Sequence, residues 1–518
     1  MNSVYDEIKP GFEKRLLLIT ASVLFGFLLL NSINSINFFK PDEYYQIIEF
    51  AAFKQGKVQA ADLAWEYQKK SRQAIQPFMC YLLFEGLDKI HVSEPIQQIR
   101  ILRIATSLVT ISCIFLFVAS ALKFFIPPYR SAFIISSFLF WAVPFFYVRF
   151  SSESFSQSLF LLAFSILFTG NKNFKRTFLL GMILGLTFFV RFQSAFGFIG
   201  LFVGLVLFHH FKFIDFVHLA LGSAAVIFLC VAVDAWFYGT WIFTPWNYFY
   251  YNIMQKAADN FGIYPFYYYL VTLFLFSTPI CGVIFFAVLG GLAFFRKINV
   301  IYLTFISSFL ILSIIGHKEF RFLISILNFL PFLTILGIQE ICRKKPGFIE
   351  LFSNKVLLAV LISLNVIMLS LATLKNNNLI SRDPKALAVA IVQNYSHAKI
   401  QLIYAPDCHP FRDVVRLKFL NDTWQTTYQH FLMPKKMSEC CIFSLEDSCL
   451  QNKLEETTQI LYLNKATFIS MGGRQDFNKL SYQLKYISIP RWFDDILNRN
   501  AFLGAKLNKN VYYAFVRS

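Results

Sequence analysis

The sequence predicts a polytopic α-helical membrane protein with about 11 transmembrane helices and a soluble α/β domain at the C-terminal end. Three observations support this class. Only 15% of the 518 residues are charged and 56% are hydrophobic, whereas soluble domains have about 25% charged residues. Phenylalanine alone accounts for 64 residues. Beyond residue 375, long apolar runs give way to short, strand-like ones.

The apolar segments define the expected helices, since a helix needs about 20 residues to cross the hydrocarbon core. They cover residues 16–38, 101–125, 131–148, 155–170, 177–190, 195–211, 215–237, 266–295, 299–316, 320–340 and 355–374. Segments 155–170 and 177–190 are short and need flanking residues to span a bilayer. Pro279 and the Gly290-Gly291 pair predict a kink in segment 266–295.

Basic residues between the spans predict the orientation. Lys14 and Arg15 precede the first span, so the positive-inside rule places the N-terminus in the cytoplasm. Alternation then puts most short basic clusters on the same side and the loop 39–99 outside; that loop is rich in lysine, but long translocated loops follow the rule weakly. We therefore predict a transmembrane domain over 1–375 and a non-cytoplasmic soluble domain over 376–518.

The formal net charge of +18 does not predict nucleic-acid binding, because the lysines and arginines are scattered between apolar spans. This pattern favours topology signals and contacts with anionic lipids or phosphates.

Residues 376–518 predict strands at Ile400–Tyr404, Ile460–Leu463, Leu484–Ile489 and Val511–Val516. The cysteines of this domain are Cys408, Cys440, Cys441 and Cys449. They allow three pairings and lack the twin C-x-x-C spacing of a zinc site, so no metal site is predicted. A disulfide is expected only if the domain faces an oxidising compartment.

Unusual polar residues fall at or beyond the non-cytoplasmic ends of the predicted spans. They are Asp42, Glu43, Trp65, Glu66, Tyr67, Arg72, Arg149, Glu153, Arg191, Gln193, Asp234, Asn252, His317, Glu319 and Arg321. Polar groups near a bilayer are costly and mark sites of function. Their convergence on one membrane face, from positions hundreds of residues apart, predicts a functional site there.

Each motif also has a structural interpretation. Asp42 and Glu43 follow Pro41, so they could complement a helix dipole, or one carboxylate could take a proton from a substrate hydroxyl. Trp65 and its neighbours could anchor the chain at the interface or stack against a sugar. The turn from Gly316 to Phe322 could be a plain basic loop or could bind a phosphate leaving group.

Five blocks in order carry a resemblance to glycosyltransferase family 22, the α-mannosyltransferases that use polyprenyl or dolichyl phosphate mannose. They are Pro41-Asp42-Glu43, Trp65-Glu66-Tyr67 with Arg72 and Pro77, Asp234…Tyr238-Gly239 with Asn247 and Asn252, Phe261-Gly262…Pro265-Phe266-Tyr267-Tyr268-Tyr269, and His317-Lys318-Glu319-x-Arg321-Phe322-Leu323. Pro406-Asp407-Cys408-His409 is similar to an element of the GPI mannosyltransferase 3 type. Two positions depart from the family pattern, where Lys40 replaces a histidine and Gln68 replaces an arginine.

The resemblance implies a GT-C fold and an inverting hexosyltransferase that moves mannose from a polyprenyl (dolichyl) phosphate donor to a glycolipid or lipid-linked glycan acceptor, as in GPI-anchor assembly. It implies no required metal or cofactor, membrane lipids as partners, and a location in the endoplasmic reticulum membrane of a eukaryote or the inner membrane of a bacterium. Asp42 would be the general base and Glu43 its neighbour. The expected substrate-binding residues are Trp65, Glu66, Arg72, Arg149, Arg191, Asp234, Tyr238, Asn252, His317, Lys318, Glu319 and Arg321.

Two alternatives remain. Another GT-C transferase, for aminoarabinose, arabinose or protein O-mannosylation, would share the fold, but the turn at 317–323 favours family 22. A lipid or sugar transporter would place charges near span midpoints and show repeated halves. Here the charges lie at span ends and no repeat is visible.

Overall fold

The computed structural model describes residues 11–34, 41–141, 144–170, 172–276, 278–376, 385–395, 398–406, 408–413, 427–428, 430–488, 491–499 and 511–517. The chain forms two compact units. The first contains Met1–Ser32, Trp65–Cys80 and Leu102–Ala372, and the second contains Ile33–Ala64, Tyr81–Ile101 and Thr373–Ser518. The second unit thus combines segments of the first predicted loop with the C-terminal residues.

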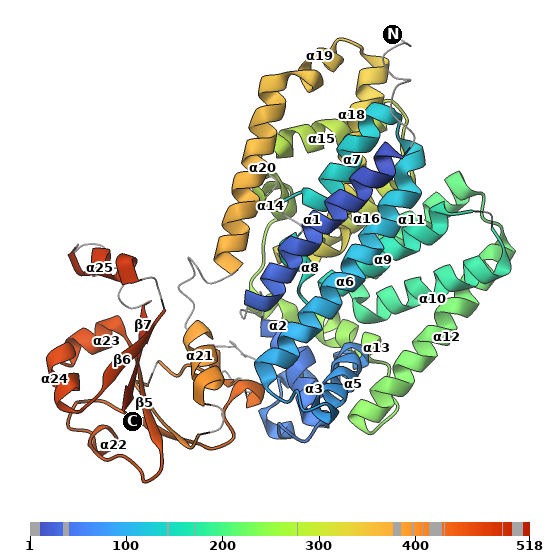
Figure 1. Ribbon diagram of the computed structural model, residues 1–518. Coiled ribbons are helices and arrows are strands. Elements are labelled where there is room, and N and C mark those ends of the chain that lie inside the picture. Colours follow the sequence, from blue (N-terminus) through green and yellow to red (C-terminus); the bar gives the residue numbers. More distant parts are fainter. Residues whose placement is uncertain are drawn as a thin grey trace. The chain divides into compact units, whose positions relative to one another are not determined.

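The first unit is a bundle of helices (Figure 1). Its helices are α1 (Phe12–Asn34), α4 (Trp65–Gln68), α7 (Pro127–Leu139), α8 (Pro144–Tyr147), α9 (Ser152–Phe168), α10 (Phe174–Val190), α11 (Ala195–His209), α12 (Phe213–Tyr238), α13 (Thr244–Phe249), α14 (Tyr268–Phe276), α15 (Pro279–Phe294), α16 (Val300–Ile314), α17 (Ile324–Leu327), α18 (Phe329–Lys344), α19 (Phe348–Ser353) and α20 (Lys355–Asn376). Helices α5 (Ile75–Lys89) and α6 (Pro95–Ala121) contribute to both units, and the last residues of α1 and α20 belong to the second. The short helices η3 (Leu122–Phe124), η4 (Phe192–Ser194), η5 (Tyr250–Met254), η6 (Ala257–Phe261) and η7 (Phe320–Leu323) lie between them.

All eleven predicted apolar segments coincide with helices, but several are short or broken. In the described residues, five helices are long and apolar enough to cross a membrane, and a sixth span results if the bent pair at 320–344 counts as one. Segment 266–295 breaks before Pro279, as predicted. The bend between α17 and α18 is 61°, and α17 ends at Leu327, whose carbonyl would meet the ring of Pro331 in a continuous helix.

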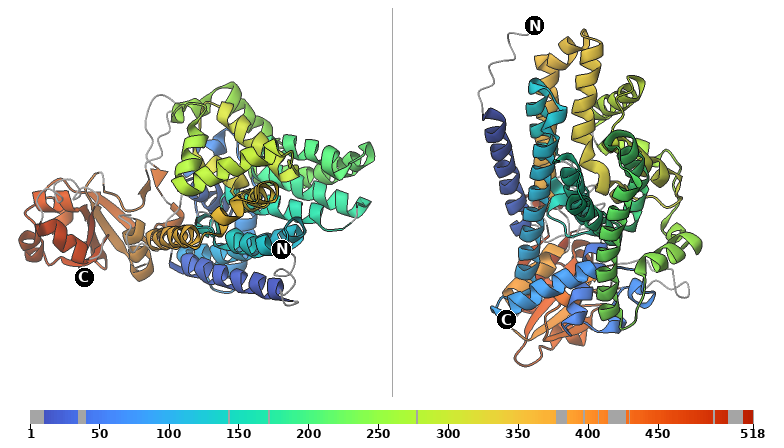
Figure 2. Two further views of the ribbon diagram at one scale, coloured as in Figure 1. Left: turned by 90° about the horizontal axis from the view of Figure 1, so that it is seen from above. Right: turned by 90° about the vertical axis from the view of Figure 1, so that its right-hand side faces the viewer.

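Glycines allow two helix pairs to approach closely. Helix α10 lies beside α12 (Figure 1 and Figure 2), and a Cβ on Gly181 or Gly222 would clash with a carbonyl of the opposite helix. On α11, a Cβ on Gly200 would clash with the carbonyl of Leu303 in α16. Small residues spaced four apart are a common means of close packing between membrane helices.

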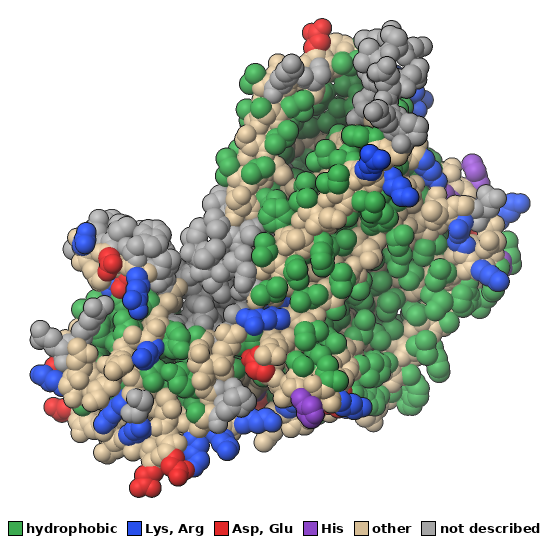
Figure 3. Space-filling model, viewed as in Figure 1, with side chains coloured by type: hydrophobic (Ala, Val, Ile, Leu, Met, Phe, Trp, Pro, Cys, Tyr) green, Lys and Arg blue, Asp and Glu red, His purple; other side chains and the backbone are tan. Residues whose placement is uncertain are grey.

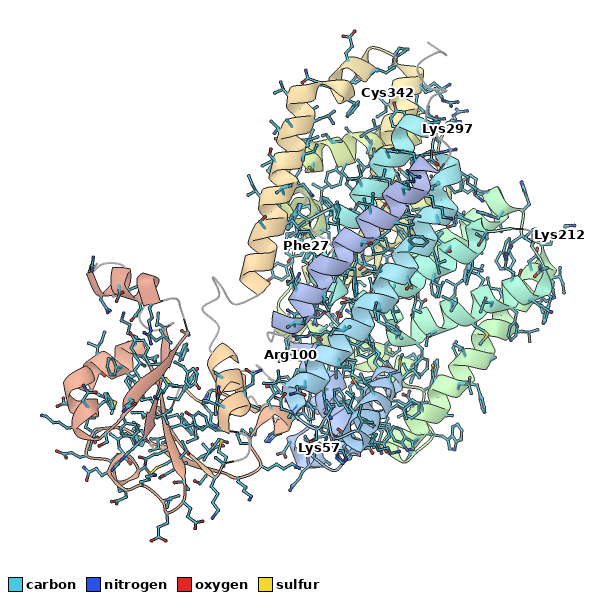
Figure 4. The ribbon with its side chains drawn as sticks, viewed as in Figure 1. Phe27, Lys57, Arg100, Lys212, Lys297 and Cys342 are labelled. Atoms are coloured by element: carbon cyan, nitrogen blue, oxygen red, sulfur yellow. A yellow bond between two sulfur atoms is a disulfide. The ribbon has the colours of Figure 1, made fainter. Side chains whose placement is uncertain are left out.

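The bundle presents an apolar outer surface, with hydrophobic side chains covering much of the visible face (Figure 3). Exposed examples include Leu18, Ile19, Leu108, Val206 and Phe228. Basic residues lie at helix ends instead. Lys297 is an example: it lies near the same end of the bundle as Cys342 (Figure 4), and its Nζ is 4.0 Å from Glu340 of α18. This distribution is that of a protein whose flank faces lipid.

The second unit contains a five-stranded sheet in the order β4-β1-β5-β7-β6. Strands β1, β4 and β5 run parallel, and β7 is antiparallel to both β5 and β6. The strands are β1 (Ile400–Tyr404), β4 (Met437–Cys441), β5 (Thr458–Asn464), β6 (Gln483–Ile487) and β7 (Tyr512–Arg517), with a separate pair β2 (Arg412–Asp413) and β3 (Thr427–Tyr428). Four of these strands were predicted.

The helices of the second unit come from two parts of the chain: the segment after the first apolar helix and the C-terminal residues that also form the sheet. They are α2 (Pro41–Glu43), η1 (Tyr44–Ile48), α3 (Glu49–Lys54), η2 (Ala60–Asp62), α21 (Lys385–Tyr395), η8 (His430–Leu432), α22 (Ser448–Gln451), α23 (Lys465–Ser470), α24 (Arg474–Lys479) and α25 (Arg491–Arg499). Of the four cysteines, Cys440 and Cys449 form a disulfide, and Cys408 and Cys441 are not disulfide-bonded.

Candidate active site

Asp42 and Glu43 lie in the second unit, in the first turn of a helical stretch that continues to Lys54. Asp42 is half-buried and Glu43 is buried. The next five residues, Tyr44–Ile48, form a π-helical turn before α3 begins. Such wide turns are rare and often occur at functional sites. The helix-end interpretation of the two acids is geometrically correct, and it leaves the carboxylate of Asp42 partly accessible. Lys40 lies outside the described residues.

The C-terminal segment η8 fixes this helical stretch within the second unit. The backbone N–H of Phe431 donates to Glu49 Oε1 at 3.0 Å, and that of Leu432 donates to the Tyr44 hydroxyl at 3.1 Å. The ring of Phe431 stacks on Phe84 with centroids 5.5 Å apart. Burial raises the pKa of Glu49 to about 7 and raises that of Tyr44 well above its usual range.

In the first unit, the segment from Trp65 to Ala74 is tied to α12 and α13. Asp234 is fully buried and uses both carboxylate oxygens: Oδ1 accepts from the backbone N–H of Ala74 at 2.7 Å, and Oδ2 accepts from the hydroxyl of Thr244 at 2.6 Å. The Tyr238 hydroxyl donates to the carbonyl of Arg72 at 2.7 Å. Asp234 and Tyr238 therefore hold this loop in place.

The same loop brings Glu66 and Arg72 together. Arg72 Nη2 is 3.9 Å from Glu66 Oε1, and its guanidinium lies over the ring of Tyr248 at 5.3 Å. The Tyr248 hydroxyl accepts from Gln193 Nε2 at 2.5 Å, which links the loop to η4. Trp65 and Glu66 are buried. Asn252 donates to the carbonyl of Tyr248 at 3.1 Å, a local contact.

A second cluster joins three helix ends through Glu153. Its Oε1 lies 3.0 Å from Arg191 Nη2 and 3.8 Å from Arg321 Nη1, and the side chains of Glu153 and Arg191 are each only 4% exposed. Arg321 also pairs with Glu319 at 2.8 Å. Residues from α9, the end of α10 and η7 thus meet in one cluster. Arg149 is buried just before α9.

His317 and Lys318 are held by backbone carbonyls. The Nδ1 of His317 lies 2.9 Å from the carbonyl oxygen of Gly262, so Nδ1 carries the proton, and Nε2 faces Glu319 at 3.4 Å. Lys318 Nζ donates to the carbonyls of Tyr264, at 2.8 Å, Ile315 and Gly316. An ammonium has three donors, so these carbonyls occupy them all.

Chemically, the first unit offers a buried arginine, Arg191, and a half-buried one, Arg321, balanced by Glu153 and Glu319. Guanidinium groups of this kind suit an anion such as a phosphate, which can displace one carboxylate contact. Within the described residues, the one trio of metal-ligand side chains is Cys440, Asp447 and Cys449, in the second unit, where the two cysteines form the disulfide.

Several contributors escaped the sequence interpretation. Glu153 stood out only as a charge near a span end, and its partner, Arg191, is 38 residues away in the chain. Thr244 and Tyr248 carry no individual signal, because threonine and tyrosine are common at membrane interfaces.

Comparison with solved structures identifies the class of fold. The chain resembles the crystal structure of ArnT from Cupriavidus metallidurans bound to undecaprenyl phosphate, with a TM-score of 0.52, 10% identity and 98% of each chain covered. The apo structure of the same protein gives a TM-score of 0.50. This likeness shows the fold and confirms the expected GT-C architecture.

The chain belongs to the Alg9-like mannosyltransferase family, which matches residues 19–432. It is 31% identical over 140 residues to GPI alpha-1,2-mannosyltransferase 3 of Danio rerio, which is 26% of this chain and 24% of that protein. It is 32% identical over 122 residues to Mannosyltransferase APTG1 of Arabidopsis thaliana, covering 22% and 20%. These alignments span about a quarter or less of the relatives' length. The family predicted from the motifs is confirmed, and the chain is a multi-pass membrane protein.

Proposed function

We propose that this protein is an inverting mannosyltransferase that moves mannose from a polyprenyl (dolichyl) phosphate donor to a glycolipid or lipid-linked glycan, as in GPI-anchor assembly or a related pathway. The observation that carries the proposal is the family match over residues 19–432, which contains both polar clusters and Asp42. The names of the Danio rerio and Arabidopsis thaliana relatives support mannose as the sugar.

In the proposed reaction, the carboxylate of Asp42 takes the proton of the acceptor hydroxyl. The hydroxyl oxygen bonds to the anomeric carbon from the face opposite the phosphate, and the carbon–oxygen bond to the phosphate breaks. The lipid phosphate leaves with one more negative charge, which Arg191 and Arg321 stabilise. Glu153 holds the two arginines in place before the donor binds.

In this proposal, the residues of the turn 317–321 have different roles. Lys318 has all three donors on carbonyls, so it fixes the turn and does not contact phosphate. His317 donates its Nδ1–H to the carbonyl of Gly262 and orients its ring beside Glu319, so in this proposal it positions the turn. Of the other predicted site residues, Trp65, Glu66, Arg72 and Arg149 bind sugar or acceptor, and Asp234 and Tyr238 hold the loop that carries the first three.

We place the reaction on the lumenal or periplasmic side of the membrane, in the endoplasmic reticulum of a eukaryote or the inner membrane of a bacterium. We propose membrane lipids as the partners of the protein and no binding of nucleic acid. The mechanism uses no metal ion or other cofactor, since arginines supply the positive charge.

Replacing the proposed base tests the mechanism directly. Asp42→Asn keeps the size of the side chain and removes its basicity, so sugar transfer in isolated membranes should fall by 100-fold or more, about the usual contribution of a general base. Protein level and unfolding temperature should not change. Retained transfer would remove Asp42 from the mechanism.

The acceptor can be identified separately. Mass analysis of lipid-linked glycans from a deletion strain should reveal a truncated species that lacks one hexose and disappears on complementation. An unchanged profile would contradict the transferase function.

A further inference from the structure

Gln157 is a buried amide without a hydrogen-bond partner in the described part of the chain. It is 1% exposed, in the first half of α9, and neither its Nε2 nor its Oε1 has a hydrogen-bond partner among the described residues. Nearby polar side chains of the same helix are satisfied: Ser156 bonds to Ser194 and Ser325, and Ser158 bonds to Thr110.

Stability alone does not favour glutamine at this position. A buried polar group without a partner costs about 1–3 kcal/mol. A leucine or methionine of similar volume would avoid this cost. The rest of α9 after Gln157 is largely apolar, so the amide is an exception in a segment that otherwise follows the packing rule.

The position of Gln157 is next to the Glu153 cluster. The two residues are four apart on α9, which puts their side chains on one face of the helix, one turn apart. The preceding residue, Ser156, contacts Ser325 of α17 at 2.9 Å. Asn328, at the bend after α17, is also buried; its Oδ1 accepts from the Tyr147 hydroxyl at 2.5 Å, but its Nδ2 has no partner among the described residues.

We propose that the carboxamide of Gln157 binds a hydroxyl group of the sugar substrate, one helical turn from Glu153, which pairs with the arginines proposed to hold the phosphate. An amide offers one acceptor and two donors without charge, which suits a hydroxyl and not a phosphate. The inference rests on the proposed transferase function and extends it to a sugar-binding residue. The hydroxyl can belong to the mannose of the donor or to the acceptor glycan, and the two sources are distinguishable.

The test compares Gln157→Leu with Gln339→Leu in the full-length purified protein. Gln339 is a buried amide of the same bundle with both functions satisfied: its Oε1 accepts from Ile126 N–H at 2.9 Å and its Nε2 donates to the Phe124 carbonyl at 3.1 Å. Without ligand, Gln339→Leu should lower the unfolding temperature, whereas Gln157→Leu should leave it unchanged or raise it.

The probes are a polyprenyl phosphate mannose and the same polyprenyl phosphate without sugar. Wild-type protein should be stabilised more by the mannose lipid than by the bare lipid phosphate. In Gln157→Leu this difference should vanish and the KM for the donor should rise about tenfold, the loss of one buried hydrogen bond. If the difference persists but the KM for the truncated glycan acceptor rises, the hydroxyl belongs to the acceptor.

Two results would overturn the assignment. Gln157→Leu could keep the mannose-dependent stabilisation and both KM values, or it could lose stability as Gln339→Leu does, which would make Gln157 structural. A wild-type protein that ignores the mannose on the lipid and transfers no sugar would refute the proposed function itself. The two failures are therefore separable.

Discussion

At the scale of single residues, Glu153 and Arg191 form a buried ion pair in the first unit. Both side chains are 4% exposed. Removing one partner of such a pair leaves an uncompensated buried charge, which typically costs 3–5 kcal/mol. Arg321 is a second cation near Glu153, at 3.8 Å. Glu153 therefore keeps one cationic partner when an anion binds the other arginine. One arginine can therefore bind a phosphate without leaving the Glu153 carboxylate unpaired.

Glu49 makes a pH-dependent prediction. Because burial raises its pKa from 4.5 to about 7, the folded protein binds this proton more tightly than the unfolded chain does. Its stabilising contribution is therefore complete below about pH 4.5 and is lost as the pH rises through about 7, a loss of roughly 3 kcal/mol. Glu49→Gln should remove this dependence in thermal unfolding between pH 5 and about 8.

The groups that face Glu49 are Tyr44, Asp62 and the backbone at His430 and Phe431. His430 lies 3.8 Å from Asp62 and is unchanged in the variant, so the difference between variant and wild type isolates Glu49. Parallel pH profiles for the two proteins would contradict the assignment.

At the scale of elements, the contact between α10 and α12 depends on two glycines. Gly181 and Gly222 each leave space for a carbonyl of the other helix, at Leu219 and Phe178. These helices can approach so closely only because no Cβ lies between them, and the close approach gains van der Waals contacts that lipid does not replace. The end of α10 carries Arg191, so the glycine contact also determines where this guanidinium lies.

Gly181→Ala should therefore destabilise the bundle even though alanine favours helices. We expect a lower unfolding temperature and reduced activity, because the added methyl group meets the Leu219 carbonyl. Gly290→Ala in α15 is the matched control: nothing lies within 4 Å of its added Cβ, so the substitution should be neutral or stabilising by up to about 1 kcal/mol. Equal unfolding temperatures for both variants would contradict the close approach.

The elements also mark where sequence reasoning succeeds. Long apolar runs and Pro279 predicted helices and a break, because both act through local backbone chemistry. Strand β4 (Met437–Cys441) was missed, since it lies at the edge of the sheet and is mostly half-buried or exposed, without an apolar signal. The partner of Glu153 could not be read from the chain, because ion pairing between helices depends on packing that no spacing rule encodes.

At the scale of the whole molecule, hydrogen bonds join helix ends that the alternation of membrane spans predicts on the same side. Glu153 begins α9 in one polar cluster, and α9 ends at Phe168, whose carbonyl accepts a hydrogen bond from Lys123. Lys172 donates to the carbonyl of His210 at 2.7 Å. The predicted cytoplasmic loops thus contact one another, as do the predicted non-cytoplasmic ends. Composition alone predicted the class of protein; the contacts required the fold.

Thiol labelling tests the orientation. Cys441 is an exposed free thiol in the domain expected outside, and Lys345 is an exposed residue in a loop expected inside. In sealed vesicles of known sidedness, a membrane-impermeant maleimide should label Cys441 and an introduced Lys345→Cys from opposite sides. A Cys441→Ser background provides the control, and labelling of both from one side would contradict the predicted topology.

The three carbonyls around Lys318 have a consequence for motion. One comes from Tyr264, in the loop before α14, and the other two come from Ile315 and Gly316, just after α16. His317 adds a contact to the carbonyl of Gly262. One ammonium therefore fastens the end of α16 to the loop before α14. If the enzyme opens to admit a lipid-linked sugar, these two segments must travel together as one rigid body, and the hinge must lie elsewhere.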